Sequence, residues 1–278
     1  MKVAYLGIPG SYSYIAAQKY FGSSVSMVGL NNFKQIFDSV SSDKVNVGLV
    51  PVENSLTGSI YQTYDLLLER KLKIVGETIL KIKHCLLINQ IKINNKTQML
   101  KKIRVCFSHP EAIKQCQSFF EKHKNIKPVF VSDTASAAKQ LKIKKSEKAC
   151  VISNAETAKL YGLSILRDDV QDNPNNYTRF VVVSRDSEQN GNKVSLIFSV
   201  VHKPGSLVKI LEPYADLGLN LTKIESRPVA GKPWEYIFIV DFELNDSSDL
   251  HKVLGQMKNH ANFIKVLGRF EKGKIYES

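Results

Sequence analysis

The chain has 278 residues, enough for two globular domains, and 43% of them are hydrophobic, an ordinary content for a globular protein. No apolar run reaches the ~18 residues that a membrane-spanning helix needs, and Pro9-Gly10 comes too early for a signal-peptide core, so we expect a cytoplasmic protein without membrane contact. The formal net charge of +13 is compatible with nucleic acid or an anionic metabolite as partner, but no aromatic-interleaved basic motif accompanies it, and a lysine-rich solvated surface is the favoured interpretation.

The cysteines are too scattered to form a zinc or redox motif. Cys85, Cys106, Cys116 and Cys150 form no CxxC pair, and no histidine lies at zinc-finger spacing from them. Most have apolar neighbours, which predicts buried free thiols in a reducing compartment. We therefore expect no metal site.

Short apolar runs alternate with helical patterns from residue 1 to about 184. The runs predict strands at 3–6, 45–50, 74–88, 103–107, 129–131 and 149–152. Helices are predicted between them: Phe33, Ile36, Phe37 and Val40 follow the i, i+3, i+4, i+7 spacing, and Asp133 is placed to cap a helix. This alternation is typical of an α/β domain with a wound, largely parallel sheet.

A polar segment at 185–193 predicts a linker to a second module at 194–278. Strands are predicted at 194–200, 219–227, 234–243 and 264–270, with one helix opened by Pro204-Gly205-Ser206 and another capped by Asp246-Ser247-Ser248. The resulting βαββαβ order is the ferredoxin-like plan. Because such a module leaves a sheet face and sheet edges open, we expect it to pair with another copy in a homo-oligomer.

Polar side chains gather at several strand-to-helix turns. Ser11 can cap a helix whose free N–H groups suit a carboxylate or phosphate, although a plain capped turn is the alternative. Asn54, Ser55 and Thr57 lie together where one capping residue would suffice, which suggests a ligand, although they are also ordinary loop residues. His109 is a candidate acid or base, while a structural role is the more common one for such a histidine.

Residues 171–180, Gln-Asp-Asn-Pro-Asn-Asn-Tyr-Thr-Arg-Phe, bring amides, a hydroxyl, a guanidinium and an aromatic ring to the start of an apolar strand. Polar groups at the mouth of a buried strand are typical of a site for a small polar ligand in α/β domains. A solvated turn is the alternative interpretation of these residues alone. No Ser/His/Asp order and no Cys/His pair is supported by spacing.

Together these segments resemble the prephenate dehydratase family with its C-terminal ACT regulatory domain. The resemblance covers nearly the whole chain. It rests on Gly7 to Ser13, Pro51 to Gly58, Ser108-His109-Pro110, Asp133-Thr134-Ala135, Tyr161-Gly162-Leu163, Gln171-Asp172-Asn173, Thr178-Arg179-Phe180 and Glu225 to Pro228. We recognise no chorismate mutase segment, which favours the monofunctional form. Tyr14, Glu111 and Ser206 depart from residues common in the family.

The resemblance implies a two-lobed catalytic domain at 1–184, similar to type II periplasmic binding proteins. Lobe one would cover about 1–80 and 160–184, lobe two about 80–160, and an ACT domain would follow at 194–278. The implied reaction is the decarboxylating dehydration of prephenate to phenylpyruvate, water and CO2 in L-phenylalanine biosynthesis, with feedback control by phenylalanine and no metal or organic cofactor. Arogenate dehydratase and a two-lobed sensor without chemistry are the alternatives.

The resemblance also implies residue roles. Thr178 is the expected catalytic residue, with a hydrogen bond to the leaving hydroxyl; water and a protonated carboxyl such as Glu53 are the alternative proton sources. The expected substrate-binding residues are Ser11, Asn54, Ser55, Thr57, Gly58, Arg179 and Phe180. The expected phenylalanine-binding residues are Gly205, Ser206, Leu207, Val208, Asn220, Leu221, Glu225, Ser226, Arg227 and Pro228. Prephenate or arogenate as substrate, and a homodimer or homotetramer as assembly, stay open at this point.

Overall fold

The computed structural model describes residues 1–89, 95–186, 190–229, 231 and 234–278. These residues form two compact units: the first contains Met1–Thr63, Thr78–Phe180 and Lys274–Ser278, and the second contains Tyr64–Glu77 and Val181–Gly273. Residues 187–189 of the predicted linker, and 230 and 232–233 of the predicted hairpin turn, lie outside the described residues. The domain boundaries derived from the sequence stay a prediction.

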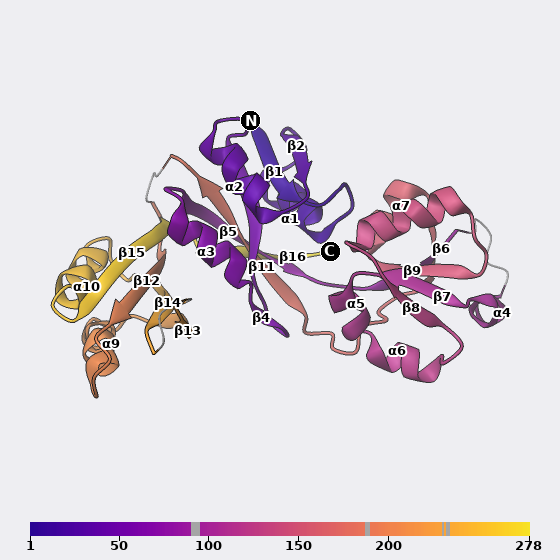
Figure 1. Ribbon diagram of the computed structural model, residues 1–278. Helices are drawn as coiled ribbons and strands as arrows, with labels where there is room; N and C mark the ends of the chain where they lie inside the picture. Colours follow the sequence, from indigo (N-terminus) through magenta and orange to yellow (C-terminus); the bar gives the residue numbers. More distant parts are fainter. Residues whose placement is uncertain (90–94, 187–189, 230, 232–233) are drawn as a thin grey trace. The chain divides into compact units, whose positions relative to one another are not determined.

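The first sheet has the strand order β16-β5-β11-β3-β1-β2, with β4 paired to β3 (Figure 1). Its strands are β1 (Lys2–Leu6), β2 (Ser26–Leu30), β3 (Val47–Asn54), β4 (Gly58–Ser59), β5 (Lys73–Lys81), β11 (Tyr177–Ser184) and β16 (Lys274–Glu277), and its helices are α1 (Tyr12–Phe21), α2 (Phe33–Ser41) and α3 (Tyr61–Glu69). β1 is parallel to both β2 and β3. Helix α2 buries Ile36, Phe37 and Val40, as their spacing predicts.

The second sheet lies within the first unit and has the order β10-β6-β9-β7-β8. Its strands are β6 (Cys85–Ile88), β7 (Val105–Ser108), β8 (Lys127–Phe130), β9 (Ala149–Ser153) and β10 (Ser164–Arg167), and its helices are α4 (Lys96–Lys102), α5 (Pro110–Lys114), α6 (Gln117–Lys122), α7 (Thr134–Lys144) and α8 (Ala155–Tyr161). β7 is parallel to β8 and β9, whereas β6 is antiparallel to β9 and β10. The predicted two-lobed α/β class is confirmed, with one sheet for each lobe.

The single strand predicted at 74–88 is wrong. β5 ends at Lys81 in the first sheet, and β6 begins at Cys85 in the second, so residues 82–84 cross from one lobe to the other. Both strands are buried, and an apolar run therefore continues through the change of sheet. Only the polar interruption at Lys81, Lys83 and His84 indicates the crossing.

The strand order reverses beside β1 in the first sheet and beside β7 in the second. β2 and β3 flank β1 in one sheet, and β8 and β9 flank β7 in the other. Ligands of open α/β sheets bind outside the carboxyl ends of the strands at such a switch point. In this chain those ends lead into the turns that carry Ser11, Asn54, His109 and Asn154. A site between the lobes is therefore expected where these turns meet.

Helix α8 of the second lobe holds the β1–α1 turn of the first. The Asn154 amide and the Thr157 hydroxyl donate to the Gly10 carbonyl oxygen at 2.9 and 2.8 Å. A Cβ atom at Gly10 would lie 2.9 Å from the Thr157 hydroxyl oxygen, and the backbone there has φ +91°. The close approach and the positive φ both require glycine at this turn.

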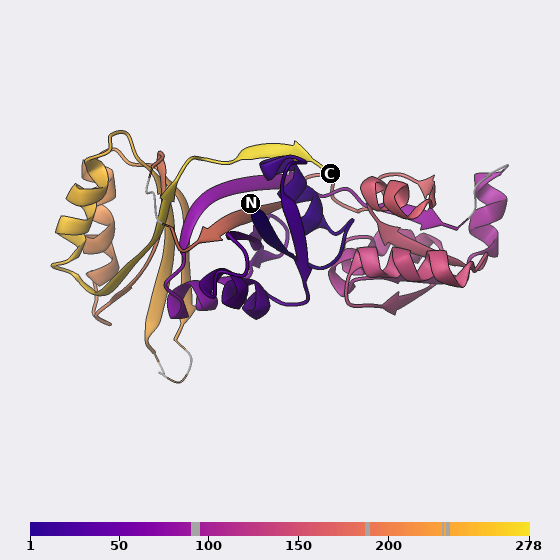
Figure 2. The ribbon, with the colours of Figure 1, turned by 90° about the horizontal axis from the view of Figure 1, so that it is seen from above.

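The second unit contains a four-stranded sheet in the order β13-β14-β12-β15. Its elements are β12 (Lys193–Val200), α9 (Ser206–Asp216), β13 (Leu221–Pro228), β14 (Tyr236–Glu243), α10 (Asp249–Met257) and β15 (Ala261–Phe270). Both helices lie on one face of the sheet (Figures 1 and 2) and share a core that includes Phe198, Tyr214 and Phe242. The predicted ferredoxin-like βαββαβ order is confirmed, and Gly218, at φ +63°, follows α9 as expected.

Two ion pairs join the parts of this second unit. Lys193 Nζ lies 3.0 and 2.8 Å from the two carboxylate oxygens of Glu77, and both side chains are buried. Arg227 on β13 makes a bidentate pair with Asp65 on α3, with Nη2 to Oδ2 at 3.0 Å. The C-terminal module and the segment 64–77 are thus linked by charge as well as by packing.

The described part of the chain contains no helix that is long and apolar enough to cross a membrane. The predicted cytoplasmic location stays a prediction. All four cysteines are buried free thiols, as their apolar surroundings predict.

Candidate functional site

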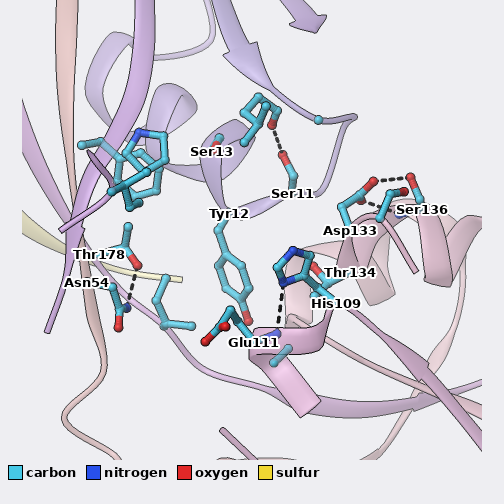
Figure 3. Close-up of a pocket in the computed structure, with 18 of the residues that line it drawn as sticks. Ser11, Tyr12, Ser13, Asn54, His109, Glu111, Asp133, Thr134, Ser136 and Thr178 are labelled. Atoms are coloured by element: carbon cyan, nitrogen blue, oxygen red, sulfur yellow. Dashed lines mark hydrogen bonds between the residues drawn. The ribbon is translucent and has the colours of Figure 1, made fainter. Parts of the chain in front are cut away.

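A cavity of about 520 Å³ lies where the turns of the two switch points meet in the first unit (Figure 3). Its lining includes Ser11, Tyr12, Ser13, Asn54, Thr57, Ile60, Ile82, His84, His109, Glu111, Gln115, Asp133, Thr134, Ser136, Thr178 and Phe180. Figure 3 shows the Tyr12 ring with Thr178 and Asn54 to one side and His109 to the other. The lining combines an apolar wall with hydroxyl, amide, imidazole and carboxylate groups.

Asn54 and Thr178 are linked directly at this cavity. The Asn54 side-chain nitrogen Nδ2 lies 3.0 Å from Thr178 Oγ1 and donates to it. The orientation of this amide is fixed, because its oxygen accepts the backbone N–H groups of Leu56 and Thr57 at 3.0 and 3.1 Å. The Thr178 oxygen thus serves as an acceptor towards Asn54, and its own proton is available for another group.

The same amide begins a buried chain of hydrogen bonds that reaches His84. Asn54 Nδ2 donates to Asn176 Oδ1 at 2.7 Å, and Asn176 Nδ2 donates to Gln115 Oε1 at 2.8 Å. His84 Nε2 lies 2.9 Å from that Gln115 oxygen. The chain connects the carboxyl end of β3 with the crossing segment at 82–84.

His84 and Tyr12 form a close pair at the end of this chain. His84 Nδ1 lies 2.7 Å from the Tyr12 hydroxyl oxygen, which also lies 2.7 Å from the Lys83 carbonyl oxygen. Burial lowers the pKa of His84 to about 4, an effect that the Gln115 contact partly opposes. Burial also holds the pKa of Tyr12 well above its ordinary value, so the phenol keeps its proton.

Helix starts surround the cavity. Ser11 Oγ accepts from the Tyr14 N–H at the start of α1, and Asp133 Oδ1 accepts from the Ser136 N–H at the start of α7. The first N–H groups of a helix have no carbonyl partner within it and favour anions. His109 Nδ1 accepts from the Glu111 N–H at 3.2 Å, so this histidine acts as a helix cap.

The cavity contrasts with the basic surface of the chain. Among the described residues that line it, none is lysine or arginine, whereas Glu111 and Asp133 are acidic. An anion bound there would depend on helix starts, hydroxyl groups and histidine rather than on a cationic side chain.

The structure brings most of the predicted substrate-binding residues together, but not all. Ser11, Asn54, Thr57, Thr178 and Phe180 line the cavity. Ser55 does not: its hydroxyl accepts from the Tyr177 N–H at 2.9 Å and donates to the Asn175 carbonyl oxygen at 3.1 Å, which ties the Asn54 turn to β11.

Gly58 and Arg179 also lie outside the lining. Gly58 begins β4, which pairs with β3, and its φ is +83°. Arg179 Nε lies 3.2 Å from Glu53 Oε2. Strand alternation places Thr178 and Phe180 on one face of β11 and Arg179 on the other, so the guanidinium binds a protein carboxylate and does not reach the cavity.

The residues predicted to bind phenylalanine lie at two places in the second unit. Gly205 is the N-cap of α9 with φ +81°, and Ser206 and Leu207 help to line a cavity of about 430 Å³ with Trp234 and Tyr236. The remaining ones, Asn220, Leu221, Glu225, Ser226, Arg227 and Pro228, lie on or beside the edge strand β13, and Val208 is exposed on α9. Within that strand Glu225 pairs with Lys223 at 2.9 Å.

Four of the residues at this cavity and its hydrogen-bond network were not predicted from the sequence, namely Tyr12, His84, Gln115 and Asn176. Tyr12 and Asn176 belong to motifs singled out in the sequence, but neither was distinguished from its neighbours. His84 was hidden in the apolar run 74–88. Gln115 lies seven residues beyond the end of β7, on the turn after a helix of five residues, where no spacing rule points to a ligand. In the described part of the chain no group of His, Cys, Asp and Glu side chains is arranged to hold a metal ion.

The chain is a two-lobed α/β protein with a cavity between its lobes, and it also contains a ferredoxin-like module. The family model for prephenate dehydratase matches residues 3–188. The chain is 37% identical over 284 residues to an arogenate dehydratase/prephenate dehydratase of Arabidopsis thaliana, with 97% of this chain and 72% of the relative covered. The chain therefore belongs to the prephenate dehydratase family and is a dehydratase enzyme.

Solved structures agree with this fold. A prephenate dehydratase from Arthrobacter aurescens in complex with L-Phe is 25% identical, with TM-score 0.85 and coverage of 98% of this chain and 90% of that one. A structure described as GqqA, a novel type of quorum quenching acylase, is 28% identical, with TM-score 0.84 and 98% of both chains covered. The whole architecture, including the C-terminal module, is therefore shared with these proteins.

Proposed function

We propose that this enzyme converts prephenate to phenylpyruvate, water and CO2 in L-phenylalanine biosynthesis. In this reaction the ring carboxylate leaves as CO2 and the C4 hydroxyl leaves as water, while the ring becomes aromatic. Aromatisation drives the reaction, so the main barrier is the expulsion of the hydroxyl oxygen. A catalyst must therefore offer that oxygen a hydrogen bond or a proton as charge develops on it.

The observation that carries this proposal is the hydrogen bond from Asn54 Nδ2 to Thr178 Oγ1 at 3.0 Å. Because the Asn54 oxygen is held by two backbone N–H groups, the amide cannot reverse to accept the threonine proton. The hydroxyl of Thr178 is left as a donor at the cavity wall. A threonine is too weak an acid to release its proton, so its role is to stabilise the departing oxygen.

The two carboxylates of prephenate need different surroundings, because one loses its charge in the reaction and the other keeps it. The ring carboxylate becomes neutral CO2, and an apolar wall favours that loss of charge; Ile60, Ile82 and Phe180 supply such a wall. The pyruvyl carboxylate stays charged, and the first N–H groups of α1, near Ser11, suit it. No direct contact with the substrate is assigned to the residues that do not line the cavity, which include Glu53, Ser55, Gly58 and Arg179.

Arogenate is the second candidate substrate, since it differs in carrying an amine in place of the keto group. The acidic side chains Glu111 and Asp133 at the cavity favour it, because either carboxylate suits an ammonium group. The Arabidopsis relative is named for both activities. A sensor without chemistry is the remaining alternative, and it predicts ligand binding without product.

We also propose that phenylalanine regulates the enzyme through the second unit. The similar protein from Arthrobacter aurescens has been solved with L-Phe. The N-terminus of α9 at Gly205 has no side-chain cap, so its N–H groups suit an amino-acid carboxylate. The edge strand β13 offers its open side to a second copy of the module. Phenylalanine would bind at residues 205–208 and 220–228 of such a pair and favour an inactive arrangement.

One assay tests these proposals together. Prephenate and arogenate are supplied separately to the purified chain, and phenylpyruvate or phenylalanine formation is followed with and without added phenylalanine. We expect turnover of prephenate and inhibition by phenylalanine. Turnover of arogenate alone would reassign the substrate, binding without any product would support the sensor, and turnover that phenylalanine leaves unchanged would remove the regulatory proposal.

A further inference from the structure

The proposed reaction, on which this inference rests, consumes a proton. Prephenate is a dianion, and its products are a monoanion, neutral CO2 and water, so one proton must enter the site in each cycle. Among the described residues that line the cavity, His84 and His109 are the only ones with a basic side chain. His109 Nδ1 is already engaged, because it accepts the Glu111 N–H as the cap of α5.

The hydrogen-bond chain fixes which nitrogen of His84 carries a proton. The Asn54 amide is oriented by the backbone, Asn54 Nδ2 requires an oxygen on Asn176, and Asn176 Nδ2 in turn requires an oxygen on Gln115. The atom of Gln115 that faces His84 Nε2 at 2.9 Å is therefore an acceptor. His84 Nε2 must carry a proton, and in the neutral ring Nδ1 carries none.

At the Tyr12 end of this series of hydrogen bonds there are more acceptors than protons. The Tyr12 hydroxyl oxygen lies 2.7 Å from the Lys83 carbonyl oxygen and 2.7 Å from His84 Nδ1, and it has a single proton for both acceptors. If Nδ1 is protonated as well, it donates to the Tyr12 oxygen, and the Tyr12 proton satisfies Lys83 or a group in the cavity. With a neutral ring the Tyr12 proton serves one of the two acceptors, whereas a doubly protonated ring leaves the Tyr12 proton free to be donated onward.

We propose that His84 takes up a proton when the dianionic substrate binds, and that this proton passes through the Tyr12 hydroxyl to the oxygen that leaves. A dianion in a cavity without lysine or arginine favours the charged ring through its Coulomb field. Tyr12 is then the catalytic acid, and His84 is the positioning residue that supplies its proton. Thr178 donates the second hydrogen bond to the same oxygen.

The step balances without an oxidant or reductant. The bond from the ring to its carboxylate breaks, and the electron pair enters the ring as CO2 departs. The C4–O bond breaks, and the oxygen leaves with the electron pair of the C4–O bond and takes the Tyr12 proton. Tyr12 takes the Nδ1 proton from His84, which returns to the neutral ring and is protonated again from solvent in the next cycle.

The other titratable groups near the pair do not compete for this role. Burial raises the pKa of Cys85, which follows His84, to about 11, and burial also raises the pKa of Cys116. The Lys83 side chain pairs with Glu277 at 2.7 Å. Asp172 accepts the backbone N–H groups of Gln117 and Ser118 at 2.8 and 3.1 Å as the cap of α6.

Proton uptake is the direct test. Prephenate is titrated into the slow Thr178→Ala protein near pH 7.5 in buffers of different ionisation enthalpy, which counts the protons taken up. We expect about one proton for each prephenate bound, almost none when His84→Gln is added, and no change when the exposed His251→Gln is added as control. Equal uptake with and without His84 would overturn the proposal.

Tyr12→Phe separates uptake from transfer. The double variant Tyr12→Phe/Thr178→Ala should still take up the proton when prephenate binds. The single variant Tyr12→Phe should have a kcat at least tenfold lower than the natural chain. Retained kcat would remove Tyr12 as the acid. If His84→Gln does not fold, ¹⁵N-histidine spectra of the Thr178→Ala protein decide: prephenate should convert a neutral buried imidazole to the doubly protonated form, and a ring that stays neutral contradicts the proposal.

These results are distinguishable from failure of the proposed function. A natural chain that converts neither prephenate nor arogenate would remove the proposed reaction itself. A natural chain that converts prephenate, with a His84→Gln variant of equal kcat and equal pH profile, would remove only the proton relay.

Discussion

The side-chain amide of Asn54 donates to the Thr178 hydroxyl oxygen at 3.0 Å and joins the end of β3 to the start of β11. Residues 124 positions apart in the chain thus form one unit at the cavity wall. The direction of this bond matters more than its length, because it determines that the threonine proton points to another acceptor. The first two predictions follow from that direction.

Replacing Thr178 by alanine removes the donor to the leaving oxygen. We expect turnover of prephenate to fall at least ~100-fold, as for loss of other transition-state donors, with the fold retained because the side chain is only partly buried. Thr178→Ser keeps the hydroxyl and should keep most of the turnover. Steady-state kinetics with the exposed Thr97→Ala as control measure this, and near-normal turnover of Thr178→Ala would reject the role.

Replacing Asn54 by aspartate reverses the direction of the same bond. A carboxylate cannot donate, so the Thr178 proton would turn towards residue 54 and away from the substrate. We expect a loss similar to that of Thr178→Ala, and little further loss in the double variant, since the two residues act as one unit. Exposed Asn175→Asp is the control. Losses that multiply in the double variant would show independent roles.

The sequence pointed to this unit only in part. Asn54 was predicted from the cluster of polar residues at a strand-to-helix turn, and Thr178 from the resemblance to the prephenate dehydratase family. Their mutual contact could not be predicted, since it depends on which strands are neighbours, and β3 and β11 are far apart in the chain. Arg179 was expected at the substrate, but strand alternation turns it to Glu53.

His84 makes the stability of the ligand-free protein depend on pH. Burial lowers its pKa to about 4, so the unfolded chain binds this proton more tightly than the folded one. Stability is therefore complete above the ordinary histidine pKa of ~6.5 and falls as pH drops towards about 4, by up to about 3 kcal/mol. Urea unfolding of the natural chain and His84→Gln from pH 7.5 to 4.5 measures the difference, and parallel curves would contradict the assignment.

The buried pair of Lys193 and Glu77 should matter for folding. Lys193→Met leaves the Glu77 carboxylate buried without its cation, which costs about 3–5 kcal/mol. The double variant with Glu77→Gln should recover part of that loss. Lys34→Met, which breaks an exposed pair with Asp38, is the control and should cost no more than about 1 kcal/mol. A Lys193→Met chain as stable as this control would show that the buried pair contributes little.

The pair of Arg227 and Asp65 provides a test of the regulatory proposal. Arg227 belongs to the predicted effector segment, while Asp65 lies on α3, which begins at Tyr61, a few residues after the Asn54 turn. We expect Asp65→Asn to weaken inhibition by phenylalanine about fivefold, a coupling change of about 1 kcal/mol, with kcat unchanged. Charge exchange through Asp65→Arg and Arg227→Asp should restore part of the inhibition, and exposed Asp216→Asn is the control. Unchanged inhibition in Asp65→Asn would exclude this contact from the coupling.

The second module was predicted more completely than the catalytic site. Its strands alternate and its helices carry clear apolar stripes, so the βαββαβ order can be read from local patterns alone. The crossing at residues 82–84 could not, because two buried strands in different sheets form one apolar run. That crossing carries His84, so the residue with the most unusual environment in the cavity was the one that local patterns concealed.

In the proposed reaction the Thr178 hydroxyl contacts the oxygen that leaves. The most direct test of this contact is a crystal structure of the chain with a stable prephenate analogue that keeps the C4 hydroxyl. We expect this oxygen to lie within about 2.6–3.2 Å of Thr178 Oγ1, with Asn54 still donating to the same threonine. An analogue bound elsewhere, or one whose C4 oxygen is beyond the reach of Thr178, would contradict it.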